Sequence, residues 1–352
     1  MKCRVCNYPT KKIYITPKLP EYIWPGLKNN KFSKCKIFGC QKCCSLQLQN
    51  FSKNRISSFY GKEAFNIISK KTHSLRINII KNYYGSDFLK KKKIIDIGGG
   101  ANPILNGKSI DVYDFKKPNK SIKSFKCNIF TGDIEKINLK KKYDIIFFLN
   151  TLEHLPNPLR AINKIKDTLA YKGKIFIEVP NFDYLIKKMP HYAIFHQHLN
   201  MYDLNNLKNL FKLSNLTIEK IFINKDVIFC SVIKKNQSKK ILKVNLNNKV
   251  NLNNKVKILK QNLLKQKKLL KTIIKQSSFN IYGAGGSAAL FIANHKFDTN
   301  KISNIYDSER RKINKFLPGT KIAIKKTHLD NKYPSISFYK INKKNNLYIN
   351  EI

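Results

Sequence analysis

The sequence predicts an α/β chain in which a doubly wound core is preceded by a small cysteine-rich unit and followed by a second α/β unit. Short apolar runs of β type alternate with helical stretches from 94 to 232, as they do in an open sheet with helices on both faces. Two strand–glycine–helix turns, 94-IIDIGGGANP-103 and 279-FNIYGAGGSAALFIA-293, indicate two such sheets. Two C-x-x-C pairs near the start indicate a metal-supported unit ahead of them.

Changes in composition divide the 352 residues into four segments. Residues 1–55 are rich in cysteine and interrupted by prolines, so they are expected to be irregular, and residues 56–233 open with a helical pattern and contain the core. Residues 234–277 lack glycine and proline, repeat VNLNNK in tandem and end in amphipathic spacing, which predicts a helical linker. Residues 278–352 form the second α/β unit, whose reduced end, 335-SISFYKINKKNNLYINEI-352, leaves its completeness open.

The net charge of +48 raises the question of a polyanionic partner. The basic residues are almost all lysine and are spread along the chain, and lysine, asparagine and isoleucine are all encoded by AT-rich codons. Proteins that bind nucleic acid rely on arginine for bidentate contacts, and arginine occurs only at positions 4, 55, 76, 160, 310 and 311. A nucleic-acid partner is therefore not expected, and a basic zinc-containing nucleic-acid-binding protein stays as an alternative from another functional class.

The sequence predicts no membrane-spanning helix, because no run of about 18 apolar residues occurs. The first residues, MKCRVCNYPTKK, lack the apolar stretch of a secretory signal. We therefore expect a cytoplasmic protein without a membrane partner, in which cysteine thiols stay reduced. The sequence predicts no particular oligomeric state.

The cysteines of the first segment have metal-ligand spacing. Cys3 and Cys6 form one C-x-x-C pair, and Cys40 and Cys43 form a second. Four thiolates in two such pairs can close a tetrahedral zinc site with Zn–S bonds of about 2.3 Å, although Cys44 could replace Cys43. Because four thiolates leave no open position for a substrate, the expected zinc is structural.

The first glycine turn is followed by acidic residues at the ends of the next predicted strands, an arrangement typical of nucleotide-binding sheets. After Asp96, the glycines from Gly98 to Gly100 let the backbone pass close to a ligand. Asp114 ends the next β-type run, where a carboxylate can accept both hydroxyls of a ribose, and Asp133 follows a third run and could meet an adenine amino group. A nicotinamide cofactor is disfavoured, because GGG is followed by ANP and does not have the spacing G-x-G-x-x-G.

The motifs DIGGGANP, YDF, GDI and NTLEHLPNP occur in this order between residues 96 and 158. In that order they resemble the successive motifs of class I S-adenosylmethionine-dependent methyltransferases, which implies a Rossmann-like core and S-adenosylmethionine as the cofactor. The resemblance places Asp96 beside the cofactor and assigns its amino-acid part to Gly98 and Gly100, its ribose to Asp114, its adenine to Asp133 and Ile134, and the methyl-transfer site to Asn150.

The order of motifs over nearly the whole chain is similar to that of the nucleotide-sugar C-methyltransferases. A four-cysteine knuckle comes first, the core with EVPN and a F-H-x-H-L segment follows, and a glycine-turn domain with 317-LPGTKIAI-324 closes the chain. Those enzymes methylate C3 of keto-deoxysugars carried on a nucleoside diphosphate. The resemblance implies a nucleotide-linked sugar as substrate, a role in polysaccharide biosynthesis, and a second Rossmann-like domain, which starts with 281-IYGAGGSAAL-290 and helps to hold that sugar.

The segment 194-IFHQHLNMYD-203 carries the residues expected to do the chemistry. C-methylation beside a ketone needs a base to remove an α-proton, and a neutral imidazole, with an unperturbed pKa of about 6.5, suits that role. In the resembled family this place has an aromatic residue (usually Tyr), His, Glu, His and Leu, and the last His is the proposed base. His196 and His198 match, so His198 is the expected base, while Phe195 and Gln197 stand where Tyr and Glu are usual.

These two departures keep other reactions open. Phe195 has no hydroxyl to donate to an enolate, and Gln197 cannot carry charge. O-methylation of a sugar or another small molecule needs no enolate stabilisation, so it would tolerate both changes better. A methyltransferase fold without turnover is a further alternative.

Three other polar residues near these motifs have expected roles. Asn181 in EVPN is expected close to the substrate. Glu153 and His154 in LEHLPNP are expected to fix the loop after the fourth strand of the core. A metal ion bound by His196 and His198 is disfavoured, because no third ligand presents itself nearby.

Overall fold

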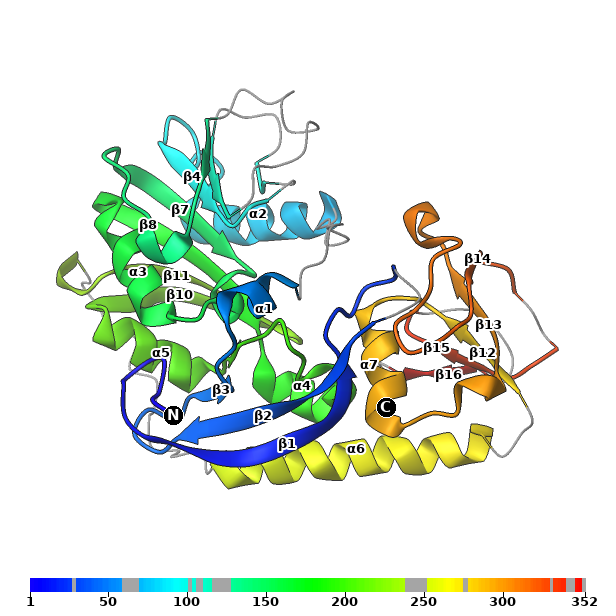
Figure 1. Ribbon diagram of the computed structural model, residues 1–352. Coiled ribbons are helices and arrows are strands. Elements are labelled where there is room, and N and C mark those ends of the chain that lie inside the picture. Colours follow the sequence, from blue (N-terminus) through cyan, green and yellow to red (C-terminus); the bar gives the residue numbers. More distant parts are fainter. Residues whose placement is uncertain are drawn as a thin grey trace.

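The computed structural model describes residues 1–26, 30–58, 70–100, 103–105, 110–115, 128–237, 252–274, 278–329, 332–339 and 346–349. These residues form three sheets, of seven, four and five strands. Figure 1 shows the seven-stranded and five-stranded sheets side by side, with the long N-terminal strands and helix α6 (Leu252–Ile274) running beneath them. None of the helices in these ranges is both long and apolar enough to cross a bilayer.

The seven-stranded sheet has the strand order β10-β11-β8-β7-β4-β5-β6. The strands from β8 to β6 in this order are parallel, and β11 and β10 add an antiparallel edge. The strands are β4 (Ile94–Ile97), β5 (Asp111–Asp114), β6 (Ile129–Thr131), β7 (Tyr143–Leu149), β8 (Leu169–Pro180), β10 (Leu216–Asn224) and β11 (Val227–Lys234). The predicted α/β core is confirmed.

Strand β7 shows why apolar runs form this sheet. Ile146 and Phe148 belong to the core cluster on one face, and Ile145 and Phe147 belong to the cluster on the other face. The helices that cover the two faces are α2 (Lys70–Tyr84) on one side and α3 (Pro158–Asp167) and α5 (Leu204–Leu213) on the other. A strand buried on both faces needs a continuous apolar run, as parallel sheets generally do.

The N-terminal segment is not irregular, as the prolines had suggested, but forms an antiparallel sheet with the order β1-β2-β3-β9. Its strands are β1 (Thr10–Pro20), β2 (Phe32–Cys40), β3 (Leu46–Leu48) and β9 (Asn200–Met201). β9 comes from the segment just after His198, and it pairs Met201 with Leu46 of β3. Backbone hydrogen bonds therefore join the cysteine-rich unit to the core.

The C-terminal unit is a parallel sheet with the order β14-β13-β12-β15-β16. Its strands are β12 (Phe279–Tyr282), β13 (Ile302–Asp307), β14 (Ile324–Lys326), β15 (Ser335–Ser337) and β16 (Asn346–Tyr348), and helix α7 (Gly286–His295) follows the second glycine turn. The described residues of the reduced end supply β15 and β16, both of which join this sheet.

Helix α6 lies in the expected linker and ties the units together. Lys255 is 2% exposed and forms ion pairs with Asp183 in α4 (Phe182–Lys188) and with Asp203, the residue before α5. Further along, Gln266 lies 3.3 Å from a ring nitrogen of both His191 and His295. Residues 59–69 of the expected first helix and 238–251, with most of the tandem repeat, lie outside the described residues.

Candidate active site

The turn after β4 requires glycine at the positions that the sequence singled out. Gly98 and Gly100 have φ angles of 81° and 52°, in the left-handed region that favours glycine. A Cβ on Gly98 would lie 2.2 Å from Oγ1 of Thr151, so the loop after β7 passes directly against the turn. Both segments leave the carboxyl ends of parallel strands, where ligands bind in open α/β sheets.

Asp96 is buried behind this turn. Only 3% of the residue is exposed, and its Oδ2 accepts a hydrogen bond of 2.9 Å from the N–H of Ile104. A Cβ on Gly99 would lie 2.6 Å from Cγ of Asp96, so the turn closes over the carboxyl group. Burial raises the pKa of Asp96 to about 7. Asp96 therefore supports the glycine turn from its buried side.

The raised pKa of Asp96 predicts a pH dependence of stability. A carboxyl group whose folded pKa lies above its unfolded value of 3.8 holds its proton more tightly in the folded state. Its contribution to stability is therefore present at acid pH and is lost as the pH rises through about 7. We expect Asp96→Asn to flatten this part of the profile, measured as the free energy of unfolding in urea across that pH range. The control is Asp87→Asn, at a side chain that is 72% exposed; identical profiles for Asp96→Asn and the wild type would contradict the prediction.

Strand β5 ends in Asp114, and Asp133 lies in the turn that follows β6. Oδ2 of Asp114 accepts a hydrogen bond of 2.9 Å from the N–H of Gly100. Asp133 caps a short 3-10 turn, where its Oδ1 accepts a hydrogen bond of 3.0 Å from the N–H of Glu135, and Ile134 beside it is buried. The order β4-β5-β6 thus brings the glycine turn and both carboxylates to one edge of the sheet.

Asn150, at the end of β7, is held by a buried ion pair. It has a φ angle of 48°, and its side-chain amide donates a hydrogen bond of 2.9 Å to Oε1 of Glu178. Arg76, which is 2% exposed, donates from Nε to Oε2 of Glu178 at 3.0 Å and from Nη2 to Oε1. The sequence reasoning missed both Arg76 and Glu178. The available signal was the arginine itself, one of few in a chain that otherwise uses lysine.

His196 faces the N-terminal sheet. It has no exposed surface, and its Nε2 lies 2.8 Å from Oγ of Ser33, while its Nδ1 lies 3.2 Å from the carbonyl oxygen of Pro20. Burial lowers the pKa of His196 to about 4. The structure does not bring the ring of His196 together with the glycine turn, and its bonds connect the histidine segment to β1 and β2.

His198 lies beside the loop that follows β7. Its ring centroid is 4.0 Å from that of Phe195 and 5.1 Å from that of His154. Burial, and next the neighbouring His154, hold the pKa of His198 well below its usual value, so the imidazole is neutral at physiological pH. The ring of Phe195 packs on this imidazole, and unlike tyrosine it offers no hydroxyl group.

Glu153 and His154 meet His198 in space. One side-chain nitrogen or oxygen of each residue lies within 4.8 Å of the other two, and Oε1 of Glu153 is 3.7 Å from Nε2 of His154. Burial raises the pKa of Glu153 to about 8, and the nearby Glu178 adds to the rise. The sequence had shown no third ligand near the two histidines. The fold supplies Glu153 and His154, because the loop after β7 meets the histidine segment.

Asn181 is a helix cap. Its Oδ1 accepts a hydrogen bond of 3.4 Å from the N–H of Tyr184 at the start of α4, and its Nδ2 donates to the carbonyl oxygen of Lys225 at 3.0 Å. Its backbone forms an isolated bridge to Tyr202. The structure therefore gives Asn181 a supporting position next to the segment that carries His198.

The cysteines of the two C-x-x-C pairs also meet. Their Sγ atoms lie within 4.8 Å of one another, with 3.5 Å between Cys3 and Cys43 and 3.4 Å between Cys6 and Cys40. The hydrogen bond with Cys43 lowers the pKa of Cys3 to about 4. Four thiols so placed fit the donor set of a closed zinc site. Cys43, and not Cys44, completes the cluster.

The cysteine unit holds the residue after His198. The carbonyl oxygen of Leu199 accepts a hydrogen bond of 2.6 Å from Nη1 of Arg4 and another of 2.9 Å from the N–H of Leu48. Arg4 follows Cys3 directly. The thiol cluster and the histidine segment are therefore one hydrogen-bonded assembly.

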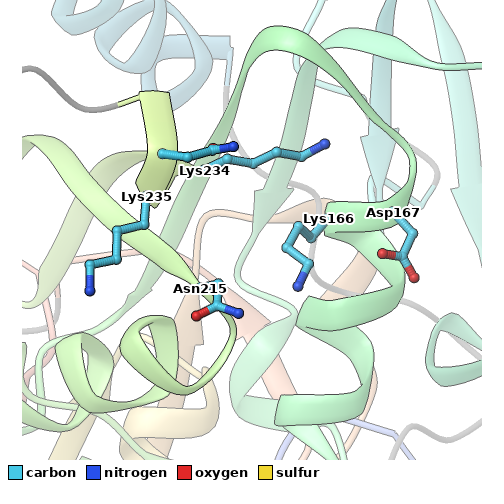
Figure 2. A pocket seen from close by; sticks show the side chains of 6 residues that line it. Lys166, Asp167, Asn215, Lys234 and Lys235 are labelled. Atoms are coloured by element: carbon cyan, nitrogen blue, oxygen red, sulfur yellow. The ribbon is translucent and has the colours of Figure 1, made fainter.

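A surface hollow of about 670 Å³ lies where α3 ends and β8 begins, at the amino end of this parallel strand and away from the glycine turn. Figure 2 shows the side chains of Lys166, Lys234 and Lys235 around it. Nζ of Lys166 donates to the carbonyl oxygen of Ser214 at 3.0 Å, and Nζ of Lys234 donates to that of Leu169 at 3.2 Å. These amines cap the ends of helix and strand, and none of the sequence motifs reaches the hollow.

Two family models match successive parts of the chain. The first, described as a methyltransferase domain, matches residues 74–221. The second, described as a C-methyltransferase C-terminal domain, matches residues 231–338. The chain thus contains a methyltransferase domain, followed by a segment that matches the C-terminal domain of C-methyltransferases.

The chain is also similar to individual proteins. An uncharacterized Methanocaldococcus jannaschii protein, MJ0638, is 32% identical over 112 residues, which make up 30% of this chain and 49% of the relative. The chain thus spans about half the length of this curated relative.

Among solved structures, a S-adenosylmethionine-dependent methyltransferase from Clostridium acetobutylicum is 12% identical, with a TM-score of 0.39, over 51% of this chain and 97% of the other. The PH0226 protein of Pyrococcus horikoshii is 14% identical, with a TM-score of 0.42, over 53% and 100% of the two chains.

Proposed function

We propose that this chain transfers a methyl group from S-adenosylmethionine to a carbon atom of a nucleotide-linked keto-deoxysugar. The observation that carries the proposal is a neutral, partly buried His198 beside the loop that follows β7, in a chain whose last domain matches that of C-methyltransferases. The order of the sequence motifs supports the sugar nucleotide as substrate. Such a product would serve polysaccharide biosynthesis.

The proposed cofactor site follows the edge formed by β4, β5, β6 and β7. The amino-acid part of the cofactor would lie against Gly98 and Gly100, where the tight turn leaves room for it. The half-buried carboxylate of Asp114, one strand away, would accept the ribose hydroxyls. Asp133 and Ile134 would border the adenine, Asn150 would border the methyl group, and Asp96 would support the turn from behind.

The cofactor site is tested by titrating the protein with S-adenosylmethionine in a calorimeter. We expect the wild type to bind and Asp114→Asn to bind about 10–100-fold more weakly, because hydrogen bonds to a charged group contribute about 1.5–3 kcal/mol. Asp144→Asn is the matched control, since Oδ2 of Asp144 also accepts a backbone N–H, that of Lys93, at 2.8 Å. Failure of the wild type to bind would overturn the proposed function.

In the proposed reaction His198 acts as the base. Its imidazole takes the α-proton of the ketone, and the electron pair of the broken C–H bond forms the enolate. The enolate carbon then attacks the methyl carbon of the cofactor, whose bond to the sulfonium sulfur breaks. The neutral state of His198 leaves a ring nitrogen able to accept the proton.

O-methylation is the second candidate, and Phe195 is the observation that favours it. Its ring packs on that of His198 at 4.0 Å, in the place where a phenol could otherwise donate to an enolate. A hydroxyl acceptor would need the base and no such donor. The two reactions are distinguished by exchange of a carbon-bound α-proton with deuterated water. His198 would catalyse this exchange in a ketone that is methylated at carbon, and O-methylation does not require it.

The remaining units would support this chemistry. We propose a structural zinc ion at Cys3, Cys6, Cys40 and Cys43 in a unit formed by residues 1–55. A core of residues 56–233 and a helical linker of residues 234–277 would lead to a sugar-nucleotide-holding domain of residues 278–352. His196 and Asn181 would position the histidine segment, by their bonds to the N-terminal sheet and to α4.

A further inference from the structure

A second group of metal-ligand side chains lies outside the cysteine cluster. Glu153 and His154 come from the loop after β7, and His198 comes from the segment before β9. One potential ligand atom of each lies within 4.8 Å of the other two. Two imidazoles and one carboxylate from two separate loops converge on one point.

The hydrogen bond of His154 determines which of its ring nitrogens carries the proton. Its Nδ1 lies 2.8 Å from the carbonyl oxygen of Gln197. A carbonyl oxygen can only accept, so Nδ1 carries the proton and Nε2 carries the lone pair. That Nε2 lies 3.7 Å from Oε1 of Glu153. An imidazole that donates its other N–H to a backbone carbonyl is typical of metal ligands.

Glu153 supplies an independent observation. The residue is only 1% exposed, and within the described part of the chain its Oε2 has no hydrogen-bond partner. A buried carboxylate oxygen without a donor is costly, and a bound cation removes that cost. The carboxyl group therefore lies beside both histidines with an unused oxygen.

The geometry points to a binding site for one divalent transition-metal ion, formed by Glu153, His154 and His198. Two histidines and one carboxylate form a donor set that suits such ions and leaves coordination positions for water or an acceptor oxygen. The site differs from the thiol cluster in its ligands and in its open positions. Borderline cations such as Co²⁺, Fe²⁺ or Zn²⁺ are the chemical class that nitrogen and carboxylate ligands accept.

A cation at this site would regulate methyl transfer. This consequence rests on the proposed function, in which His198 is the base. A cation bound to His198 occupies the lone pair that would accept the α-proton. Cation binding and proton abstraction by His198 therefore exclude each other. Loading the site would inhibit methyl transfer, and removing the ion would restore it.

The test is a Co²⁺ titration of the full chain, after its thiol cluster has been loaded with one equivalent of zinc. Calorimetry gives the affinity, and absorption distinguishes the sites, because thiolate ligands give charge-transfer bands and nitrogen and oxygen ligands do not. We expect one Co²⁺ to bind without such bands. We expect Glu153→Gln and His198→Gln each to weaken it by at least 10–100-fold. His328→Gln, at an exposed histidine in the loop after β14, is the control and should keep the ion.

Binding of S-adenosylmethionine to each variant reports on folding and separates the two proposals. If the chelated protein binds the cofactor but no Co²⁺ beyond the thiol cluster, the cation site is wrong and the proposed function stands. Unchanged Co²⁺ affinity in Glu153→Gln and His198→Gln would also overturn the site. A wild type that binds Co²⁺ at this site but not the cofactor would leave the site in place and remove the proposed function.

Discussion

Replacing His198 with glutamine is expected to lower kcat for methyl transfer by roughly 10²–10⁴-fold, the usual contribution of a positioned general base. Glutamine keeps a polar side chain at the site and cannot take a proton. The measurement has two parts, turnover with a keto-sugar nucleotide and exchange of its α-proton in deuterated water without the cofactor. Both are expected to be lost in the variant, because both need the same proton transfer.

The control for this experiment is His196→Gln. His196 is bonded to Ser33 and Pro20 of the N-terminal sheet, so its replacement should affect thermal stability more than proton exchange. Wild-type exchange in His198→Gln would rule out its role as the base. Turnover on a good substrate without any exchange in the wild type would identify an oxygen acceptor.

Arg76→Met is expected to lower the free energy of unfolding by about 3–5 kcal/mol, the usual cost of leaving one partner of a buried ion pair alone. Glu178 is 5% exposed, and besides Arg76 it also accepts the amide of Asn150. The loss should therefore appear in urea denaturation and also in weaker binding of S-adenosylmethionine. The double variant Arg76→Met with Glu178→Leu should recover part of the lost stability, since no buried charge remains unpaired.

The matched control is Lys174→Met. Lys174 lies on the same strand as Glu178, and its Nζ pairs with Oε2 of Glu219 at 2.6 Å, but the two side chains are 16% and 28% exposed. Partial exposure screens such a pair, so the expected loss is about 1 kcal/mol or less. Equal losses of unfolding free energy in Arg76→Met and Lys174→Met would contradict the prediction that the buried pair of Arg76 contributes more than an exposed pair.

The parallel core could be predicted from sequence because its signals are local. Strands such as β7 are continuous apolar runs, and the glycine turn needs its φ angles wherever it occurs. The N-terminal sheet was missed because Pro17 and Pro20 indicated a break. Both lie in β1, an edge strand of its sheet, and Pro17 falls within a register shift between Ile15 and Lys18; edge strands and bulges are the places where sheets accept proline.

The sequence predicted the positions of those site residues that lie at or just after the carboxyl ends of the parallel strands. Asp114 and Asp133 lie at the predicted edge because Asp114 is the last residue of one parallel strand and Asp133 lies in the turn after the next. The meeting of Glu153 and His154 with His198 depends on how two distant loops pack, and no local pattern encodes that. The inward position of Asp96 likewise follows from Gly99 closing over it, a contact that spacing does not show.

The pairing of β9 with β3 has a consequence for how this protein could be divided. In sequence the cysteine unit and the histidine segment are separate blocks, yet the residue after His198 is hydrogen-bonded to Arg4 and Leu48. A fragment cut between them would keep the parallel sheet and lose the strand that pairs with the segment after His198. A piece of this chain that keeps this pairing therefore has to include the cysteine unit, and cannot begin at the first strand of the parallel sheet.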